Sequence, residues 1–277
     1  MSKADTLFIN MCRKVLDEGF STEGQKIRAH WEDTGEPAWT KKAFGIVNRY
    51  DLSEEFPAVT QRPVAFKTCV KEILWIWQKK SNRLSDLDAH IWDAWADEEG
   101  TIGKAYGYQL GIKYPFKQGE MDQVDNVLWC LKNDPYSRRI MTNMFNFQDL
   151  HEMRLEPCAY SMTFNVVDGR LNAILNQRSQ DILAANAFNV AQYAVLMHML
   201  AQVSGLQVGE MVHVISDAHI YNRHLPVIAE LIERPTYPAP KFWINPDVKD
   251  FYDFTPEDFK LLDYQHGPQI KGIPVAV

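Results

Sequence analysis

The sequence predicts an α+β fold, in which a mixed, largely antiparallel β-sheet is flanked by helices. Helical patterns come first along the chain, and adjacent strand patterns with interspersed helices follow them. An Asp-Gly pair, Asp168-Gly169, joins two of these strands as a two-residue hairpin. No Pro/Gly/Ser-rich linker, long charge run or internal repeat divides the 277 residues. We therefore expect one domain that spans residues 1–277.

Three helices are expected in the first half of the chain, over residues 3–18, 67–80 and 123–132. The first has apolar residues at helical spacing and a capping pair, Ser2 and Asp5. The second is apolar over Ile73–Trp77, which indicates burial on more than one face. The third ends before Pro135, as helices commonly do.

Strand patterns dominate the rest of the chain, over residues 138–145, 159–167, 171–176, 211–215, 241–244 and 259–264. Two further helices are expected at 188–203 and 220–233, the latter with Pro226 near its first turn. Residues 182–209 contain no Asp, Glu, Lys or Arg, but their Asn, Gln, His and Ser side chains are too polar for a membrane span. This stretch predicts a core helix.

Composition excludes several classes of protein. With 46% hydrophobic residues the chain is not disordered, and its net charge of −7 argues against a general nucleic-acid coat. Any anionic ligand must therefore be held by a local group of arginines. Four cysteines without CxxC spacing, and an N-terminus without a signal-peptide core, predict a reduced, soluble, cytoplasmic protein. No GxGxxG or Walker-type phosphate loop is present.

Cys158 lies at the start of a predicted strand and has two interpretations. It is either a nucleophile or a small buried residue, because free cysteines are among the most buried residue types. The other cysteines lie inside predicted helices and are expected only to pack. A thiol protease would pair Cys158 with His219, but the sequence identifies no separate Asn or Asp that would orient this histidine.

Four further groups of residues are candidates for a ligand site. Gln177–Asp181, after the hairpin, brings an arginine, a serine and a carboxylate together at a strand end, where they form either a ligand site or a solvated turn. Arg138 and Arg139 are either a surface pair or a phosphate fork. Glu72 lies in the Trp-rich helix, so it is a candidate proton carrier unless a buried salt bridge neutralises it. Trp92 is either core or a stacking surface.

Taken together, nine motifs in the same order resemble the thymidylate synthase family. They run to the last residue and comprise Lys71–Trp77, Ile91–Trp95, Tyr106-Gly107, Ser137–Arg139, Pro157-Cys158, Gln177–Asp181, Phe188-Asn189, Asp217–Tyr221 and Pro274–Val277. The resemblance implies the family's fold, with one sheet face packed in a homodimer. It also implies conversion of dUMP and 5,10-methylenetetrahydrofolate to dTMP and dihydrofolate, without a metal or nicotinamide.

The resemblance assigns the chemistry to named residues. The Cys158 thiolate would add to uracil C6, with Arg178 bringing the thiol pKa into a useful range. Asn189 would hydrogen-bond O4 and N3 and so select uracil over cytosine, while Glu72 and Tyr106 would move protons. The remaining dUMP contacts implied are Arg28, Arg178, Ser179, Gln180, Asp181, His219 and Tyr221, with Arg138 and Arg139 supplied by the other subunit.

The folate contacts implied by the resemblance are Trp92, Asp181, Ala185, Arg62 and Ala276, with the tail Val275–Val277 closing over both ligands. The chain departs from the family pattern where Ala185 and Ala187 replace a glycine and a proline, and where Ala159 replaces a histidine after the nucleophile. The alanines at 184, 185 and 187 leave one alternative, a catalytically weak nucleotide-binding regulatory homologue. A second alternative is a dUMP hydroxymethylase of the same family, in which water instead of hydride captures the one-carbon unit.

Overall fold

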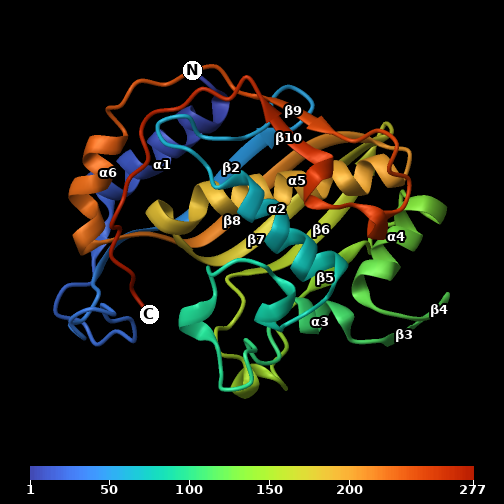
Figure 1. The fold of residues 1–277 in the computed structure, drawn as a ribbon, viewed down its shortest axis with the longest axis horizontal. Coiled ribbons are helices and arrows are strands. Elements are labelled where there is room, and N and C mark those ends of the chain that lie inside the picture. The colour runs from blue at the N-terminus through green and yellow to red at the C-terminus, as the bar shows by residue number, and fades with distance from the viewer.

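A six-stranded sheet is the largest of the three sheets in the molecule (Figure 1). The computed structural model describes all 277 residues. In spatial order the strands are β1 (Phe20–Ser21), β2 (Thr40–Asp51), β8 (Gln207–Tyr221), β7 (Arg170–Asp181), β6 (Ala159–Val167) and β5 (Met141–Asn143). Two small hairpins lie outside it: β3 (Tyr114–Phe116) with β4 (Gly119–Met121), and β9 (Lys241–Ile244) with β10 (Phe259–Leu262).

The sheet is mixed, and its pairing confirms the predicted α+β fold. β7 and β8 are parallel, and every other neighbouring pair is antiparallel. A parallel pair needs a crossover connection, which here is the long helix α5 (Ala187–Val203). The hairpin between β6 and β7 turns at Asp168-Gly169, where both residues have a positive φ, as the Asp-Gly pair predicts.

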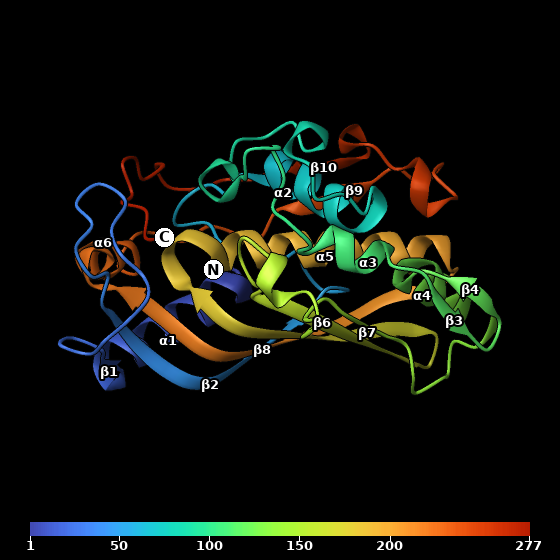
Figure 2. The same cartoon turned by 90° about the horizontal axis from the view of Figure 1, so that it is seen from below.

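The helices form layers over one face of the sheet (Figure 2). They are α1 (Lys3–Glu18), α2 (Phe66–Ile73), α3 (Gly107–Gly111), α4 (Gln123–Asn133), α5 and α6 (Leu225–Leu231). α5 lies between the sheet and α2, so it is surrounded by protein on both sides (Figure 2). Its lack of charged residues follows from this position, and the predicted core helix is confirmed. None of the helices is long and apolar enough to cross a membrane.

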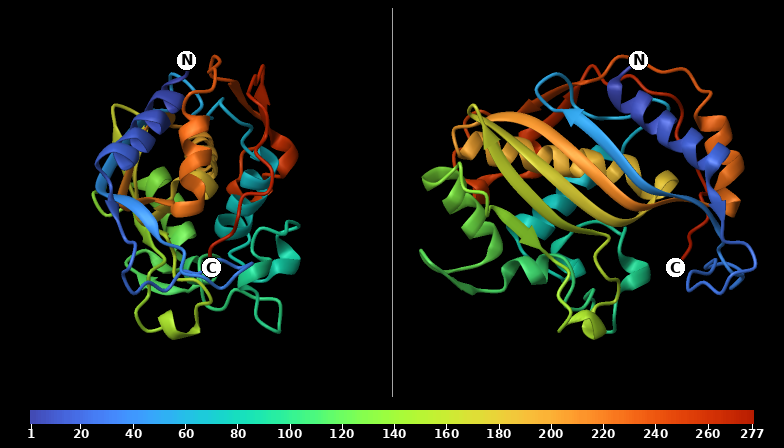
Figure 3. Two further views of the ribbon diagram at one scale, coloured as in Figure 1. Left: turned by 90° about the vertical axis from the view of Figure 1, so that its left-hand side faces the viewer. Right: turned by 180° about the vertical axis from the view of Figure 1, so that it is seen from behind.

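No helix lies over the opposite face of the six-stranded sheet (Figure 3). Apolar side chains nevertheless point outward there: Val47 is 53% exposed, Met141 49% and Ile174 41%. Phe44, near the start of β2, is 87% exposed. An open apolar sheet face of this kind is typical of a protein interaction surface.

The strand β2 is absent from the sequence prediction. Its alternation is clear only over Ile46–Tyr50, where buried and exposed residues follow each other, and two lysines and Gly45 precede that stretch. Gly45 has φ = 72°, and the register with β8 is the same before and after it, from Phe44 opposite Asp217 to Ile46 opposite Ile215. Pairing with β8 therefore holds the first half of the strand in place, and local sequence does not reveal that pairing.

Several predicted boundaries are wrong. The helix predicted over 220–233 begins only at Leu225, because Ile220 and Tyr221 pair with β2 and extend β8. The strand predicted over 138–145 is limited to Met141–Asn143, so Arg138 and Arg139 lie in the preceding turn. The strand predicted over 171–176 continues to Asp181. Residues 177–181 therefore belong to a strand, and their interpretation as a solvated turn is wrong.

Two helices contain a π-helical turn at the site. The helix predicted over 67–80 is α-helical to Ile73 and π-helical over Leu74–Gln78, and a second π turn, Ile182–Asn186, precedes α5. π turns occur frequently at functional sites because they change the direction in which side chains point. No periodicity of the sequence indicates either turn.

Candidate active site

One cavity collects most of the residues that the sequence analysis singles out. Its volume is about 510 Å³, and it lies between α2, α5, the C-terminal tail and the ends of β7 and β8. Fourteen of the seventeen predicted residues line it: Arg28, Arg62, Glu72, Trp92, Tyr106, Cys158, Arg178, Ser179, Asp181, Ala185, Asn189, His219, Tyr221 and Ala276. Segments far apart in the chain thus contribute to one site.

Sheet pairing explains how the chain brings these residues together. Cys158 directly precedes β6, and its carbonyl accepts a hydrogen bond from the backbone N–H of Arg178 at 2.9 Å. On the next strand, the parallel register of β7 and β8 sets Asp181 opposite His219. Cys158, Arg178 and the His219/Tyr221 pair predicted from sequence therefore lie at adjacent strand ends.

The Cys158 thiol is partly exposed and lines the cavity. Burial raises the pKa of this thiol, and the positive charge of Arg178 and a hydrogen bond from Tyr106 only partly offset that effect. The expectation that Arg178 lowers the thiol pKa is therefore wrong in its net direction, because desolvation outweighs the arginine. The guanidinium of Arg178 donates to the carbonyl oxygens of Glu156 at 2.7 Å and Pro157 at 3.1 Å, so it holds the segment before Cys158.

Glu72 is buried without a cation. Its two oxygens accept hydrogen bonds from the indole N–H of Trp92 and the side-chain amide of Gln192. Burial raises the pKa of this carboxyl group to about 7, although both hydrogen bonds oppose the shift. The salt-bridge interpretation is wrong, and a carboxyl group that titrates near neutrality is suited to carry a proton. Trp92 is both buried and a cavity wall, 5.2 Å from the Tyr106 ring between centroids.

Asn189 lies in the first turn of α5, within a group of side-chain amides. Its Oδ1 accepts from Gln177 Nε2 at 3.3 Å and Gln180 Nε2 at 3.4 Å, and its Nδ2 donates to Gln192 Oε1 at 3.3 Å. Gln177 Oε1 is in turn 2.7 Å from His213 Nε2. Gln180 itself does not line the cavity and acts only behind Asn189.

His219 is buried and oriented by a neighbour that the sequence analysis does not identify. Its Nδ1–H donates to Asp217 Oδ1 at 2.9 Å, and Lys42 binds the other oxygen of Asp217 at 2.7 Å. These two hydrogen bonds lower the pKa of Asp217, although burial acts in the opposite direction. The statement that His219 has no orienting carboxylate is therefore wrong. Asp217 belongs to the same predicted motif, two residues before the histidine.

The C-terminal tail is already closed over the cavity, which it lines from Ile273 to Val277. Val277 exchanges both backbone hydrogen bonds with His30, and the N–H of Glu32 donates to Val275 at 3.1 Å. The segment that follows Arg28 therefore forms a short antiparallel bridge with the tail. Arg62 and Asp181 are bound within the chain as well, to the carbonyl of Leu183 and the N–H of Ala184.

Arg138 and Arg139 do not line the cavity and are exposed. Trp95, which the sequence offers with Trp92 as a core or stacking residue, and Gln177, from the predicted Gln177–Asp181 cluster, also line the cavity. The sequence analysis gives no role to several other lining residues, namely Ile76, Gln192, Tyr193 and Ile273. Gln192 had a usable signal, because a residue three positions after Asn189 in a helix lies on the same face. The others are apolar or depend on pairing between distant segments.

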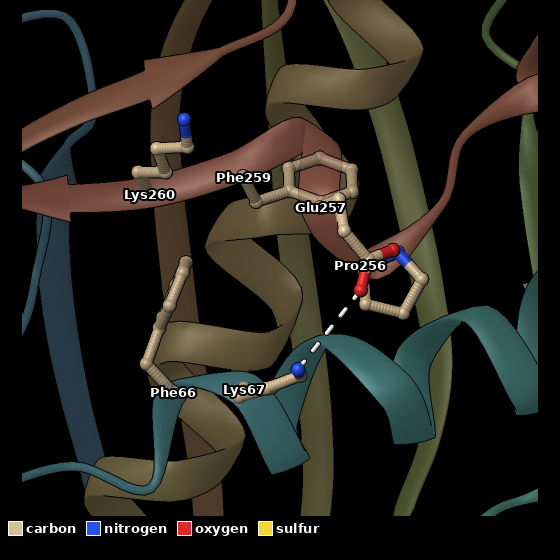
Figure 4. A pocket seen from close by; sticks show the side chains of 6 residues that line it. All are labelled: Phe66, Lys67, Pro256, Glu257, Phe259 and Lys260. Carbon is tan, nitrogen blue, oxygen red and sulfur yellow. Dashed lines mark ion pairs between the residues drawn. The ribbon is translucent and has the colours of Figure 1, made fainter.

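A second, smaller hollow lies at the other end of α2 (Figure 4). It has a volume of about 360 Å³ and is lined by Phe66, Lys67, Pro256, Glu257, Phe259 and Lys260. Its one ion pair joins Lys67 to Glu257 at 3.9 Å, and both side chains are 72% exposed (Figure 4). None of the predicted site residues borders it.

The sequence and the fold were compared with those of known proteins. The profile of the thymidylate synthase family matches residues 6–277. A thymidylate synthase of Bacillus licheniformis is 46% identical over 274 residues, and thymidylate synthase 1 of Bacillus subtilis is 44% identical over 274 residues; each alignment covers 98% of both chains. The solved structure of thermostable thymidylate synthase A from Bacillus subtilis superposes with a TM-score of 0.94 at 44% identity and covers 99% of both chains.

These matches extend over almost the whole chain. They do not favour the hydroxymethylase or the regulatory alternative. The chain belongs to the thymidylate synthase family of methyltransferases, which convert dUMP to dTMP.

Proposed function

We propose that this chain catalyses the reductive methylation of dUMP with 5,10-methylenetetrahydrofolate, and that the cavity defined above is the active site. The observation that carries this proposal is the meeting of a thiol, a carboxyl group of pKa about 7 and a fixed asparagine amide in one cavity. Each of the three groups suits one requirement of the reaction, namely addition to the pyrimidine, proton transfer and recognition of the base.

Cys158 is the proposed nucleophile. Uracil C5 is a weak nucleophile until a thiolate bonds to C6, which moves the electron pair of the C5–C6 double bond into an enolate that ends at O4. The second N–H of the Asn189 amide is free to donate to O4, where the negative charge develops. Because burial raises the pKa of the Cys158 thiol, the residues that favour the thiolate, Arg178 and Arg28, have to act against desolvation.

Glu72 is the proposed proton carrier. Its pKa of about 7 allows it to accept the proton that leaves C5 and to return it at neutral pH. Tyr106 approaches the nucleophile from the other side, because its hydroxyl accepts a hydrogen bond from the Cys158 backbone N–H at 3.0 Å. Burial raises the pKa of Tyr106, so its hydroxyl remains protonated and able to donate.

The nucleotide is proposed to enter with its phosphate toward Arg28, Arg178 and Ser179 and its ribose toward His219 and Tyr221. The folate supplies the one-carbon unit and the hydride. Its proposed contacts are Trp92, Asp181, Ala185, Arg62 and Ala276, all of which line the same cavity. A buried arginine and the closed tail are suited to an anionic, partly aromatic ligand from which water is excluded.

A homodimer is proposed because two features of the chain have no function in a monomer. The outer face of the sheet exposes Val47, Met141 and Ile174. Arg138 and Arg139 lie just before β5, at the edge of that face, and are exposed. A second copy packed on the sheet would bury the apolar residues and bring the two arginines to the partner's phosphate site.

Two further features are part of the proposal. One hydrophobic cluster of 61 buried residues connects elements from α1 to β10, which supports one domain over residues 1–277. All four cysteines are unpaired, which is typical of a reducing compartment and supports a cytoplasmic location.

The proposal is tested by mixing the protein with dUMP and 5,10-methylenetetrahydrofolate. We expect dihydrofolate to form in equal amount with a nucleotide product that is heavier than dUMP by one methylene unit. A hydroxymethylated product without dihydrofolate would identify water as the final acceptor and contradict the proposal. Binding of dUMP without any product would contradict it as well.

A further inference from the structure

Gln192 lies between two polar side chains of the site, Glu72 and Asn189, and binds both. It is 2% exposed, in the second turn of α5, and borders the cavity. Its side-chain N–H donates to Glu72, and its carbonyl oxygen accepts from Asn189 Nδ2 at 3.3 Å. One amide therefore joins the carboxyl group that titrates to the amide that faces the base.

We propose that Gln192 is a positioning residue that transmits hydrogen-bond polarity from Glu72 to Asn189 and thereby makes the site selective for uracil. This inference rests on the proposed function, in which Asn189 contacts the base and Glu72 carries the proton. It adds a residue that touches neither the nucleophile nor the base in that scheme.

The direction of the hydrogen bonds from Trp92 through Glu72 and Gln192 to Asn189 follows from which atoms can donate. The indole of Trp92 can only donate, and it occupies one oxygen of Glu72. While Glu72 is ionised, its other oxygen can only accept. The Gln192 amide therefore turns its N–H toward Glu72 and its carbonyl oxygen toward Asn189. Asn189 then has to present Nδ2 on that side, and its Oδ1 faces the opposite way.

The far side of Asn189 enforces the same orientation. Oδ1 accepts from the amide nitrogens of Gln177 and Gln180, at 3.3 and 3.4 Å. If the Asn189 amide rotated by half a turn, Nδ2 would face these two donors and Oδ1 would face the carbonyl oxygen of Gln192. Both contacts would then be repulsive, so the amide is held in one orientation from two directions.

This orientation matches uracil and opposes cytosine. Uracil offers an acceptor at O4 and a donor at N3, which Nδ2 and Oδ1 of Asn189 can satisfy together. Cytosine offers a donor at position 4 and an acceptor at N3, so it would require the rotated amide. Without Gln192, only Gln177 and Gln180 oppose rotation of the Asn189 amide. The preference for uracil over cytosine should therefore weaken.

The same contact affects the proton carrier. Three titratable groups face Glu72. They are Cys69 on its own helix, Tyr106 just before α3, and Tyr193 on α5. Burial raises the pKa of all three, so each remains neutral while Glu72 titrates. Among the groups around Glu72, only Trp92 and Gln192 stabilise its ionised form. Removal of the Gln192 N–H should therefore move the ionisation of Glu72 to higher pH.

Two variants separate the two halves of the contact. Gln192→Met keeps the volume and removes both hydrogen bonds, while Gln192→Glu keeps an acceptor for Asn189 and adds a second acid next to Glu72. Gln202→Met is the matched control, because Gln202 lies on the same helix about 15 Å away and donates only to the carbonyls of Asn245 and Val248. Circular dichroism verifies that the variants are folded.

The measurements are the dissociation constants of dUMP and dCMP by titration calorimetry and the pH profile of turnover with dUMP. For Gln192→Met we expect the preference for dUMP to fall by about tenfold or more, with the profile displaced to higher pH. Gln192→Glu should keep the preference and displace only the pH profile. Gln202→Met should change neither readout.

A Gln192→Met variant that is folded and keeps both the wild-type preference and the wild-type pH profile would overturn the inference. Loss of the preference in Gln192→Glu would overturn it as well, because that variant retains the acceptor for Asn189. Failure of the underlying function has a different signature. In that case the unmodified protein would itself not distinguish dUMP from dCMP, and substitution of Asn189 would not affect the binding of either nucleotide.

Discussion

Helix α2 borders two cavities that differ in how their polar groups are arranged. At its first turn, Lys67 and Glu257 form an ion pair in which both side chains are 72% exposed. One turn further along, Glu72 is 5% exposed and its carboxyl group binds two neutral donors. The first cavity leaves its charges in water, whereas the second removes a carboxyl group from water without supplying a cation.

The two cavities differ in how strongly their acidic groups are affected by the surrounding protein. An exposed ion pair contributes little, because water screens it and both side chains lose freedom when they associate. A buried carboxyl group held by neutral donors is costly to the fold, and its pKa moves to about 7 as a result. The cost is retained in the cavity where proton transfer is proposed, and we expect substitutions in the two cavities to have very different effects.

The largest effect is expected for Cys158→Ala, which removes the proposed nucleophile. Turnover should fall below detection, while dUMP affinity should remain within about tenfold of wild type because the phosphate and base contacts remain. Steady-state assays and calorimetric titration with dUMP measure the two quantities. Residual turnover at more than a few per cent of the wild-type rate would assign the nucleophile to another residue.

The next largest effect is expected for Glu72→Gln, which keeps the size of the side chain but cannot carry a proton and can accept from only one of its two donors, Trp92 and Gln192. Turnover should fall by about 10²- to 10⁴-fold. The binding of dUMP should weaken as well, because the new side-chain N–H faces Gln192, which then turns its oxygen away from Asn189. A rate within about threefold of wild type would contradict the role of Glu72 as proton carrier.

The same variant also tests the burial of Glu72 through stability. Because the pKa of Glu72 is raised from 4.5 to about 7 in the folded chain, the native state binds more protons than the unfolded state between these values. Wild type should therefore lose up to about 3 kcal/mol relative to Glu72→Gln as the pH rises from 4.5 to 7. Urea unfolding at several pH values measures this, and a constant difference in stability would contradict a raised pKa.

An intermediate effect is expected for Arg139→Ala, which should weaken dUMP binding by about tenfold or more if the arginine reaches the partner's phosphate. Mixing this variant with Cys158→Ala sharpens the test. Both variants are inactive or weak alone, but a mixed dimer contains one site with an intact cysteine and an intact partner arginine. Recovery of turnover on mixing supports a shared site, and no recovery under conditions of subunit exchange would contradict it.

The smallest effect is expected at the exposed cavity. Lys67→Ala should leave turnover within about twofold and the melting temperature within about 2 °C of wild type, because the exposed ion pair with Glu257 contributes little. Thermal unfolding and a steady-state assay are sufficient. A large loss of turnover in Lys67→Ala would contradict the claim that the cavity next to Lys67 takes no part in the reaction.

Local signals in the sequence predict much of the site and less of the sheet. The residues that match motifs, such as Cys158 and Asn189, are found because their chemistry is specific and their neighbours are recognisable. β2 escapes prediction because its first half is held by pairing with β8, which lies far along the chain. Gln192 and Asp217 are missed for a related reason: each acts by orienting another residue, and that role becomes visible only with distances.

The central claim is that Cys158 bonds to the pyrimidine so that C5 can accept the carbon unit, and a fluorinated substrate tests it most directly. In 5-fluoro-dUMP the hydrogen that must leave C5 is replaced by fluorine, which a base cannot remove, so the reaction should stop at a covalent complex. We expect the denatured protein, after incubation with this nucleotide and 5,10-methylenetetrahydrofolate, to carry both ligands on the peptide that contains Cys158. An unmodified protein, or an adduct on Cys12, Cys69 or Cys130 instead, would contradict the claim.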